Sequence, residues 1–383
     1  MIDLKQQLVE WRYHLHQYPE TAFEEVKTSA YIAEELKKMG LEVHGNIGGT
    51  GVVANLTVGD GKGVIGLRAD MDALNLNEIK DHPYRSQHPG KMHACGHDGH
   101  MTNLLGAAKL LSERKNFNGT VRFIFQPAEE IGKGAEAMIN DKLFERFPVD
   151  EIYGLHNMPN LPVGTIHTRP GPIMASEDNF VIRIKGKGAH ASSPHMSVDP
   201  LVIAAEIILA LQTIVARNLD PIETAVVSCT EIHTDGIRNA IPSNVEIKGD
   251  TRSFKLEVQK LLEDRMRKIC ESICEMYGAE CEFEYTHEFS PTINWDECNK
   301  IATMAAQNIV GEKNTNSDCA PFMASEDFGK FLETIPGCFV FLGVKNEGEE
   351  LIPLHNQLYD YNDEVLVIGA EFLAEIVQIR LSK

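Results

Sequence analysis

The stretch Met92-His93-Ala94-Cys95-Gly96-His97-Asp98-Gly99-His100 determines how the rest of the chain is interpreted. It places one thiol and three imidazoles within nine residues. Sulfur and imidazole nitrogen are ligands for transition metals such as Zn, Co, Ni and Mn. Glycine lets the backbone turn tightly enough for such ligands to converge. The stretch is therefore interpreted as a metal-binding loop. The alternative is a loop that merely contains several histidines.

Short apolar runs on either side of this loop predict strands and a helix. Residues 103–111 have apolar side chains at helical spacing, which places the loop at a helix N-terminus with Asp98 as its expected cap. Residues 64–67 and 120–126 are predicted strands. The first leads into Asp70 and the second leads into Glu129-Glu130. Open α/β sheets place their sites at the carboxyl ends of strands, so these acidic residues are expected near the loop.

Two domains are expected in a chain of 383 residues. Residues 1–178 and 292–383 alternate strands with helices, which predicts an α/β fold with a mixed, largely parallel sheet. Residues 179–291 change character and predict an inserted ferredoxin-like α+β unit. Its expected strands are residues 180–186, 225–230, 245–250 and 279–285, and its expected helices are 201–217 and 256–277.

The net charge of −20 argues against binding to nucleic acid and to anionic membrane surfaces. It leaves room for a small anionic substrate, which needs only a local cation. The N-terminus lacks the apolar segment of a signal peptide, and no apolar run reaches the ~20 residues of a membrane span. The eight cysteines show no spacing typical of a disulfide framework. A soluble cytoplasmic protein is expected.

Five side chains are candidate ligands for a pair of metal ions: Cys95, His97, Glu130, His156 and His355. Neighbouring side chains of an extended segment point to opposite faces. Glu130 can therefore bind metal while Glu129 faces a water molecule as its general base. Two ions ~3.5–4 Å apart would acidify a shared water and polarise a carbonyl group. The alternative is that Glu129-Glu130 is a solvated acidic turn.

Motifs that span nearly the whole chain, in one order, carry a family resemblance. The chain resembles the hippurate hydrolase and auxin-conjugate hydrolase branch of the aminoacylase/carboxypeptidase metallohydrolases. The matching segments are Gly66-Leu67-Arg68-Ala69-Asp70-Met71-Asp72-Ala73-Leu74, His93 to His100, Gln126-Pro127-Ala128-Glu129-Glu130, Leu155-His156-Asn157, Gly186-Lys187-Gly188-Ala189-His190-Ala191, Asn239-Ala240-Ile241-Pro242, Met323-Ala324-Ser325-Glu326-Asp327-Phe328 and Leu354-His355-Asn356.

The resemblance implies a zinc-exopeptidase-like catalytic domain with two divalent ions, Zn, Mn, Co or Ni, held by the same five ligands. It implies that Cys95 bridges the ions, that Glu129 is the general base, and that Asp70 orients a metal-bound histidine. His93 and His100 match the motif without a ligand role.

The resemblance also implies that the inserted domain is a lid and a dimerisation domain, in a homodimer or a dimer of dimers. His190 is similar to a histidine that stabilises the oxyanion, often in the partner subunit's site. Asn239 and Arg252 are similar to groups that hold the substrate, Arg252 by a fork to a carboxylate. For all three residues the alternative is an ordinary surface position. Asp250, beside Arg252, departs from the family pattern.

The implied activity is hydrolysis of an N-acyl-L-amino acid to a carboxylic acid and a free amino acid. Asn75 and Ala189 also depart from the family pattern but are not ligands. A dipeptidase or carboxypeptidase of the same family is one alternative. An inactive, metal-bound sensor of acylated amino acids is another, although a sensor has no use for the base Glu129.

Overall fold

The computed structural model describes residues 3–382, which form two compact units. Unit 1 runs to Ile173 and resumes over Thr292–Pro321 and from Asp327. Unit 2 comprises Met174–Pro291 and Phe322–Glu326. The insertion thus begins five residues earlier than the sequence indicated, and a short later segment joins it. That segment packs with unit 2 because the carbonyls of Phe322 and Ala324 accept the N–H of Ala175.

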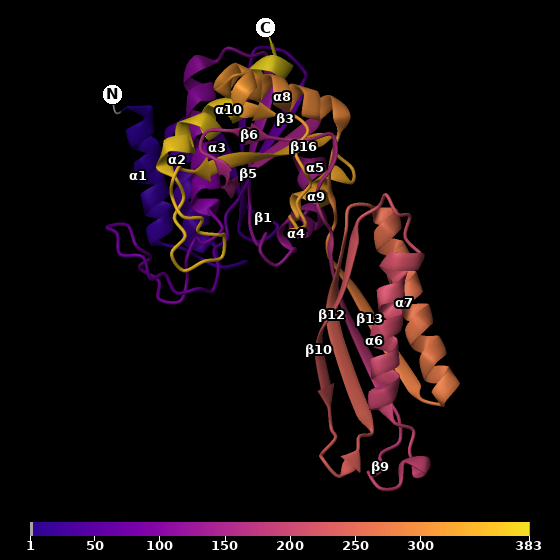
Figure 1. Cartoon of the computed structure of the whole chain (residues 1–383). Helices are drawn as coiled ribbons and strands as arrows, with labels where there is room; N and C mark the ends of the chain where they lie inside the picture. Colours follow the sequence, from indigo (N-terminus) through magenta and orange to yellow (C-terminus); the bar gives the residue numbers. More distant parts are fainter. Residues whose placement is uncertain (1–2, 383) are drawn as a thin grey trace. The chain divides into compact units, whose positions relative to one another are not determined.

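Unit 1 is built on one eight-stranded sheet (Figure 1). Its inner neighbours β4–β3, β3–β5 and β5–β16 pair in parallel, whereas β1 and β2 are antiparallel additions at one side. The predicted mixed, largely parallel sheet is confirmed. In spatial order the strands are β1 (Glu42–Ile47), β2 (Gly51–Val58), β4 (Gly119–Gln126), β3 (Val64–Asp70), β5 (Glu151–Pro162), β16 (Gly337–Lys345), β6 (Ile166–His167) and β15 (Thr315–Asn316).

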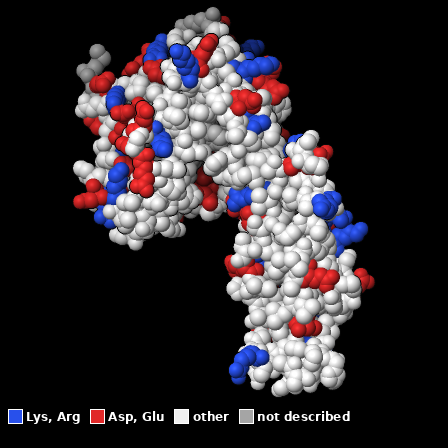
Figure 2. All heavy atoms as spheres, in the orientation of Figure 1, with Lys and Arg blue, Asp and Glu red and all other residues white. Residues whose placement is uncertain are grey.

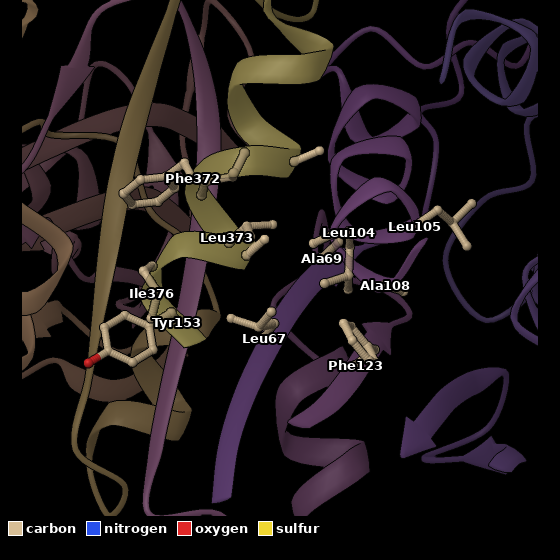
Figure 3. Packing of buried hydrophobic residues seen from close by; sticks show 14 of the residues in the cluster. Leu67, Ala69, Leu104, Leu105, Ala108, Phe123, Tyr153, Phe372, Leu373 and Ile376 are labelled. Carbon is tan, nitrogen blue, oxygen red and sulfur yellow. The ribbon is translucent and has the colours of Figure 1, made fainter. Parts of the chain in front are cut away.

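Both faces of this sheet are buried, which explains the nearly continuous apolar runs in its inner strands. On one face two helices meet the side chains of β3 and β4 (Figure 3). Leu104 comes from one helix and Leu373 from the other, and both share a core cluster with Leu67. The helices in this core are α1 (Leu4–Gln17), α2 (Val26–Lys38), α3 (His97–Arg114), α8 (Asp296–Val310) and α10 (Leu366–Arg380).

The opposite face is covered near β16 by a short helix, where Phe328 packs on Phe339. The remaining elements of unit 1 are short: α4 (Gly134–Asn140), α5 (Leu143–Arg146), α9 (Phe328–Leu332), and β7 (Gly171–Met174) paired with β14 (Thr292–Asn294). Helix α3 is almost wholly buried, and two glycines let it pack closely. A Cβ on Gly106 would lie 2.7 Å from that of Ala370, and one on Gly99 would lie 2.3 Å from the ring of Tyr361.

Unit 2 has a four-stranded antiparallel sheet with two long helices packed on it. Its chain order, strand–helix–strand–strand–helix–strand, is that of a ferredoxin-like unit. Burial alternates along the strands, so Phe180, Ile182 and Ile184 share one buried face. The elements are β8 (Glu177–Lys185), α6 (Pro200–Arg217), β10 (Ala225–Thr234), β12 (Asn244–Ser253), α7 (Leu256–Tyr277) and β13 (Glu280–Phe289), with a ribbon of β9 (Ala189–His190) and β11 (Ala240–Ile241).

Helix α6 is long and apolar enough to cross a membrane by length and composition alone. Its side chains Ile203, Ile207 and Leu211 are buried in the core of unit 2. We therefore interpret α6 as a core helix.

Candidate metal centre

The structure brings the five predicted ligands together in unit 1. Cys95 lies just before α3, and His97 is the first residue of that helix. His156 lies on β5, while Glu130 and His355 are in loops. Cys95 belongs to two groups whose ligand atoms all lie within 4.8 Å of one another: Cys95 with His97 and His156, and Cys95 with Glu130 and His355. The arrangement therefore offers two ion positions that share one sulfur.

Interatomic distances support this reading. Cys95 Sγ lies 3.4 Å from His156 Nε2, and Glu130 Oε2 lies 3.4 Å from His355 Nε2. His97 Nε2 lies 3.7 Å from Glu130 Oε1, and among the described residues neither atom has a hydrogen-bond partner although both are buried. An unsatisfied buried polar atom costs ~1–3 kcal/mol. Metal ions would satisfy both atoms, so these residues fit a metal centre.

The carboxylates around the candidate ligands give the site a negative charge that favours binding of cations. Burial, together with the nearby Glu130 and Glu129 carboxylates, holds the pKa of the Cys95 thiol well above its usual range. Burial alone would lower the pKa of His97, but the negative charge of Asp70 and its acidic neighbours raises it to about 10. Without metal the site therefore holds protons that an incoming cation displaces.

Residues behind the ligands fix their orientation. The Nδ1–H of His97 donates to the backbone carbonyl of Asp72 at 2.8 Å, which leaves Nε2 facing the other ligands. The Asp70 carboxylate is 3.8 Å from His97 Nδ1, too far for a hydrogen bond, but 2.7 Å from Nδ1 of His100. Arg68 donates to Asp70 at 2.8 Å. Asp70 was expected to orient a metal-binding histidine directly. It instead contacts His100, which is not a predicted ligand, and supports the metal-binding loop through that residue.

Asp72, absent from the predicted site, holds the turn that carries both glutamates. Its two carboxylate oxygens accept the N–H groups of Glu129 at 3.1 Å and of Glu130 at 3.0 Å. The preceding residue, Ala128, has a left-handed φ of +53°, and its N–H donates to Glu25 at 2.9 Å. Glu129 is only 6 % exposed. The turn is therefore built from buried hydrogen bonds, which disfavours the alternative of a solvated acidic turn.

His355 also has a left-handed backbone, with φ of +60°. Such a conformation costs ~1–3 kcal/mol for a residue with a Cβ and occurs preferentially at functional sites. Its N–H donates to the carbonyl of Ala94 at 2.9 Å, which ties this distant loop to the metal-binding loop. His355 is the one half-exposed side chain among the five ligands, with 54 % of its side chain exposed.

Asp98 is not the cap of α3, contrary to the sequence-based expectation. The N-cap is Gly96, in the left-handed conformation, and it makes no side-chain cap. The Asp98 carboxylate instead turns toward helix α1, where it lies 2.8 Å from His16 Nδ1 and 3.3 Å from Arg12 Nη1. Hydrogen bonds between a carboxylate and cationic side chains are stronger than those to neutral backbone N–H groups, so His16 and Arg12 outcompete the helix N-terminus for Asp98.

His190 and Asn239 lie next to each other on the β9–β11 ribbon of unit 2, and both are exposed. The Asn239 carbonyl accepts the N–H of Ala191. The N–H of Ser192 donates to His190 Nδ1 at 3.1 Å. In its neutral form His190 therefore carries its proton on Nε2, which remains available as a donor.

Arg252 lies near the end of β12 that is further from this ribbon, eight residues beyond Asn244. At ~3.3 Å per residue that separation is ~26 Å. Its guanidinium is already paired with Glu177 at 2.9 Å and with Asp250 at 3.0 Å. Asp250, which departs from the family pattern, therefore pairs directly with Arg252. A substrate carboxylate would have to compete with Asp250 and Glu177 for this guanidinium.

The sequence pattern of peptidase family M20/M25/M40 matches residues 66–379. The chain belongs to this family. It is 42 % identical over 376 residues to hippurate hydrolase of Campylobacter jejuni, covering 98 % of this chain and 97 % of that protein. It is 38 % identical to N-acetylcysteine deacetylase of Bacillus subtilis, with coverages of 98 % and 97 %.

A solved structure with a similar fold is a dinuclear metal-binding peptidase of the M20 family from Bacillus subtilis. The TM-score is 0.86 at 35 % identity, over 99 % of this chain and 98 % of that one. The fold of the whole chain, inserted unit included, is therefore found among M20 enzymes.

Proposed function

We propose that this chain is a metal-dependent amidohydrolase that cleaves N-acyl-L-amino acids of the hippurate type to a carboxylic acid and a free amino acid. The observation that carries the proposal is the position of Glu129, a buried carboxylate that lies 3.8 Å from His97 beside the five proposed ligands. Two relatives named for hippurate hydrolysis and for N-acetylcysteine deacetylation support the same class of substrate.

Cys95, His97, Glu130, His156 and His355 would hold two divalent ions of the Zn, Mn, Co and Ni series, with Cys95 shared between them. Such ions, when bound, acidify water and polarise a carbonyl group. Glu129 takes the proton of the attacking water and gives it to the nitrogen of the leaving amine. Its Oε2 lies 3.8 Å from His97 Nε2, at the edge of the ligand cluster. Asp72 and Asp70 keep these groups in place through the backbone of the glutamate turn and through His100.

His190 donates its Nε2–H to the oxyanion that develops on the acyl oxygen, and Asn239 holds the substrate beside it. Arg252 holds the substrate carboxylate. The ~26 Å along β12 exceeds the length of an N-acyl amino acid, so one copy of unit 2 cannot bring Asn239 and Arg252 to the same substrate. We therefore propose a homodimer, or a dimer of dimers, in which His190 and Asn239 complete the site of the partner subunit.

The charge distribution supports a small substrate rather than nucleic acid. On the face drawn in Figure 2, basic atoms lie interspersed with acidic ones, and the net charge is −20. All eight cysteines are free thiols within residues 3–382, which supports a location in the reducing cytoplasm.

The test is release of free amine from hippurate by the purified protein loaded with Zn or Mn, with and without a chelator. Turnover that the chelator abolishes and added metal restores is the expected result. Binding of hippurate without turnover would instead favour the sensor. Parallel assays with a dipeptide are warranted because Thermostable carboxypeptidase 1 of Saccharolobus solfataricus is 38 % identical over 96 % of this chain. Faster cleavage of the dipeptide would assign the peptidase alternative.

A further inference from the structure

A second cluster of ligand-type side chains lies in unit 1 and shares no residue with the metal centre. It comprises His16 on α1 with Glu78 and His82, both in the loop between β3 and α3. One ligand atom from each residue lies within 4.8 Å of the other two. Glu78 Oε1 lies 3.0 Å from His16 Nε2 and 2.8 Å from His82 Nε2.

His82 lies against Glu78, and neither of its ring nitrogens has a hydrogen-bond partner among the described residues. The contact between the two side chains is 2.8 Å long. The His82 side chain is only 8 % exposed, so water contributes little to satisfying it. The rings of His16 and His82 are 5.5 Å apart at 54°. Two imidazoles that bind one ion through Zn–N bonds of ~2.0–2.1 Å have a similar separation.

Groups around the cluster orient it as metal ligands are usually oriented. Asp98 Oδ2 accepts the Nδ1–H of His16 at 2.8 Å, which directs Nε2 of His16 toward Glu78. A carboxylate behind a histidine is the common support of a metal-binding imidazole. The N–H of Ser86 donates to Glu78 Oε2 at 2.7 Å, which leaves Oε1 facing both histidines. Each of the three side chains thus presents one atom to the same point.

We propose that His16, Glu78 and His82 form a third metal site, distinct from the dinuclear centre, that takes Zn²⁺ or a neighbouring first-row divalent ion. Two imidazole nitrogens and one carboxylate oxygen are a three-ligand set that Zn²⁺ accepts, with a fourth position for water. The ion cross-links α1 to the loop around residues 78–86. Through Asp98 it also fixes the first turn of α3, where His97 begins. Its role is to stabilise the segment where the metal-binding loop joins α3.

The first test is metal content after dialysis of the full chain against Zn²⁺, measured by inductively coupled plasma mass spectrometry. Wild type is expected to hold about one ion per chain more than His82→Leu, because three protein ligands are needed for tight binding. The matched control is His88→Leu, in the same loop, whose Nδ1 contacts the Pro19 carbonyl and whose ring packs edge-on against Tyr18, away from the proposed site. It should keep the wild-type content. Equal content in wild type and His82→Leu would overturn the site.

This difference does not depend on the proposed activity. Loss of the dinuclear centre would lower the content of all three proteins equally, whereas absence of the third site removes the difference between them. A second measurement needs no variant: anomalous diffraction at the zinc edge from wild-type crystals grown with Zn²⁺. A peak between His16, Glu78 and His82 is expected. Peaks at Cys95 with none between His16, Glu78 and His82 would show that these three side chains form a hydrogen-bonded cluster only. That result would refute the proposal.

Discussion

The metal centre of unit 1 and the His190–Asn239 ribbon of unit 2 hold their functional side chains in opposite ways. In unit 1 the ligands are oriented by buried partners, as His97 is by Asp72. In unit 2 the His190 side chain is exposed, and its ring is hydrogen-bonded to its near neighbour Ser192. The first region is organised before a substrate arrives, which is how electrostatic stabilisation is most effective. The second needs another surface before it can exclude water.

The largest effect is expected in the organised region. Glu129→Gln should keep fold and bound metal, because Glu129 is not among the five ligands, but it removes the group that transfers the proton. Turnover should fall by at least ~10²–10⁴-fold. Metal content and amine release are measured on the same samples, with Glu130→Gln as the control that should lose metal as well. A metal-loaded Glu129→Gln protein that turns over near the wild-type rate would remove Glu129 from the chemistry.

The exposed ribbon should give the next largest effect. His190→Ala should lower kcat by ~10²–10³-fold, the cost of one oxyanion donor, with less change in KM. Ser192→Ala is the matched control, since it removes only the hydroxyl that contacts His190 Nδ1 and leaves the Ser192 N–H donor in place. It should have a much smaller effect. An equal fall in both variants would point to the ribbon's structure rather than to the imidazole.

Mixing inactive variants tests whether the ribbon serves the partner's site. Glu129→Gln and His190→Ala chains, denatured and refolded together, should regain about a quarter of the wild-type activity, because half the dimers are mixed and one of their two sites is intact. If His190 serves the metal centre of its own chain, no mixed dimer contains an intact site. Activity that stays at the level of the separate variants would then contradict action on the partner subunit.

Asp72→Asn should have an intermediate effect that distinguishes positioning from ligation. The amide can accept one of the two N–H groups that Asp72 now accepts, but its NH₂ opposes the other. Loss of such an orienting partner typically costs ~10–100-fold in activity or metal affinity. Activity is measured across metal concentrations. A fall that excess metal fully reverses would place the effect on Glu130, whereas a fall that persists would place it on Glu129.

The same contrast explains what the sequence could predict. The five candidate ligands could be selected because thiol, imidazole and carboxylate side chains gather in one short loop and at the carboxyl ends of predicted strands. Helices such as α6 and α7 followed from apolar periodicity, and α7 begins and ends where expected. Asp72 was not predicted as a site residue because it acts by accepting the backbone N–H groups of Glu129 and Glu130. A pattern of residue types does not reveal such contacts. The available signals were its position two residues after Asp70 at the end of β3 and its place in the matching segment Gly66 to Leu74.

One error and one unforeseen contact have the same cause. Asp98 was expected to cap α3, which it does not do, and the pairing of Arg252 with Glu177 was not expected from the local sequence. Both side chains are instead engaged by distant residues: Asp98 by Arg12 and His16, and Arg252 partly by Glu177. Long-range charge pairing overrides local preference in a buried setting. The pairing of residues more than 70 positions apart depends on the tertiary fold, which local pattern does not contain.

The smallest expected effect concerns stability alone and lies in the buried charges behind the metal loop. Burial would lower the pKa of His16, but its hydrogen bonds to Asp98 and Glu78 raise it to about 9. Because the folded pKa lies above the unfolded value of ~6.5, the stabilisation is complete below pH ~6.5 and is lost as pH rises through 9. Its full size is on the order of 3 kcal/mol.

Urea unfolding of the metal-free protein near pH 6 and pH 10 measures this contribution of His16 to the free energy of unfolding. Both tryptophans, Trp11 and Trp295, lie in unit 1, so their fluorescence reports the unit that contains His16. His16→Gln should be less stable than wild type at pH 6, and the two should converge toward pH 10, where the wild-type imidazole is neutral. The comparison uses the change with pH because the variant leaves Asp98 and Glu78 buried at both values. A gap that stays constant would mean that His16 stabilises by packing rather than by its charge.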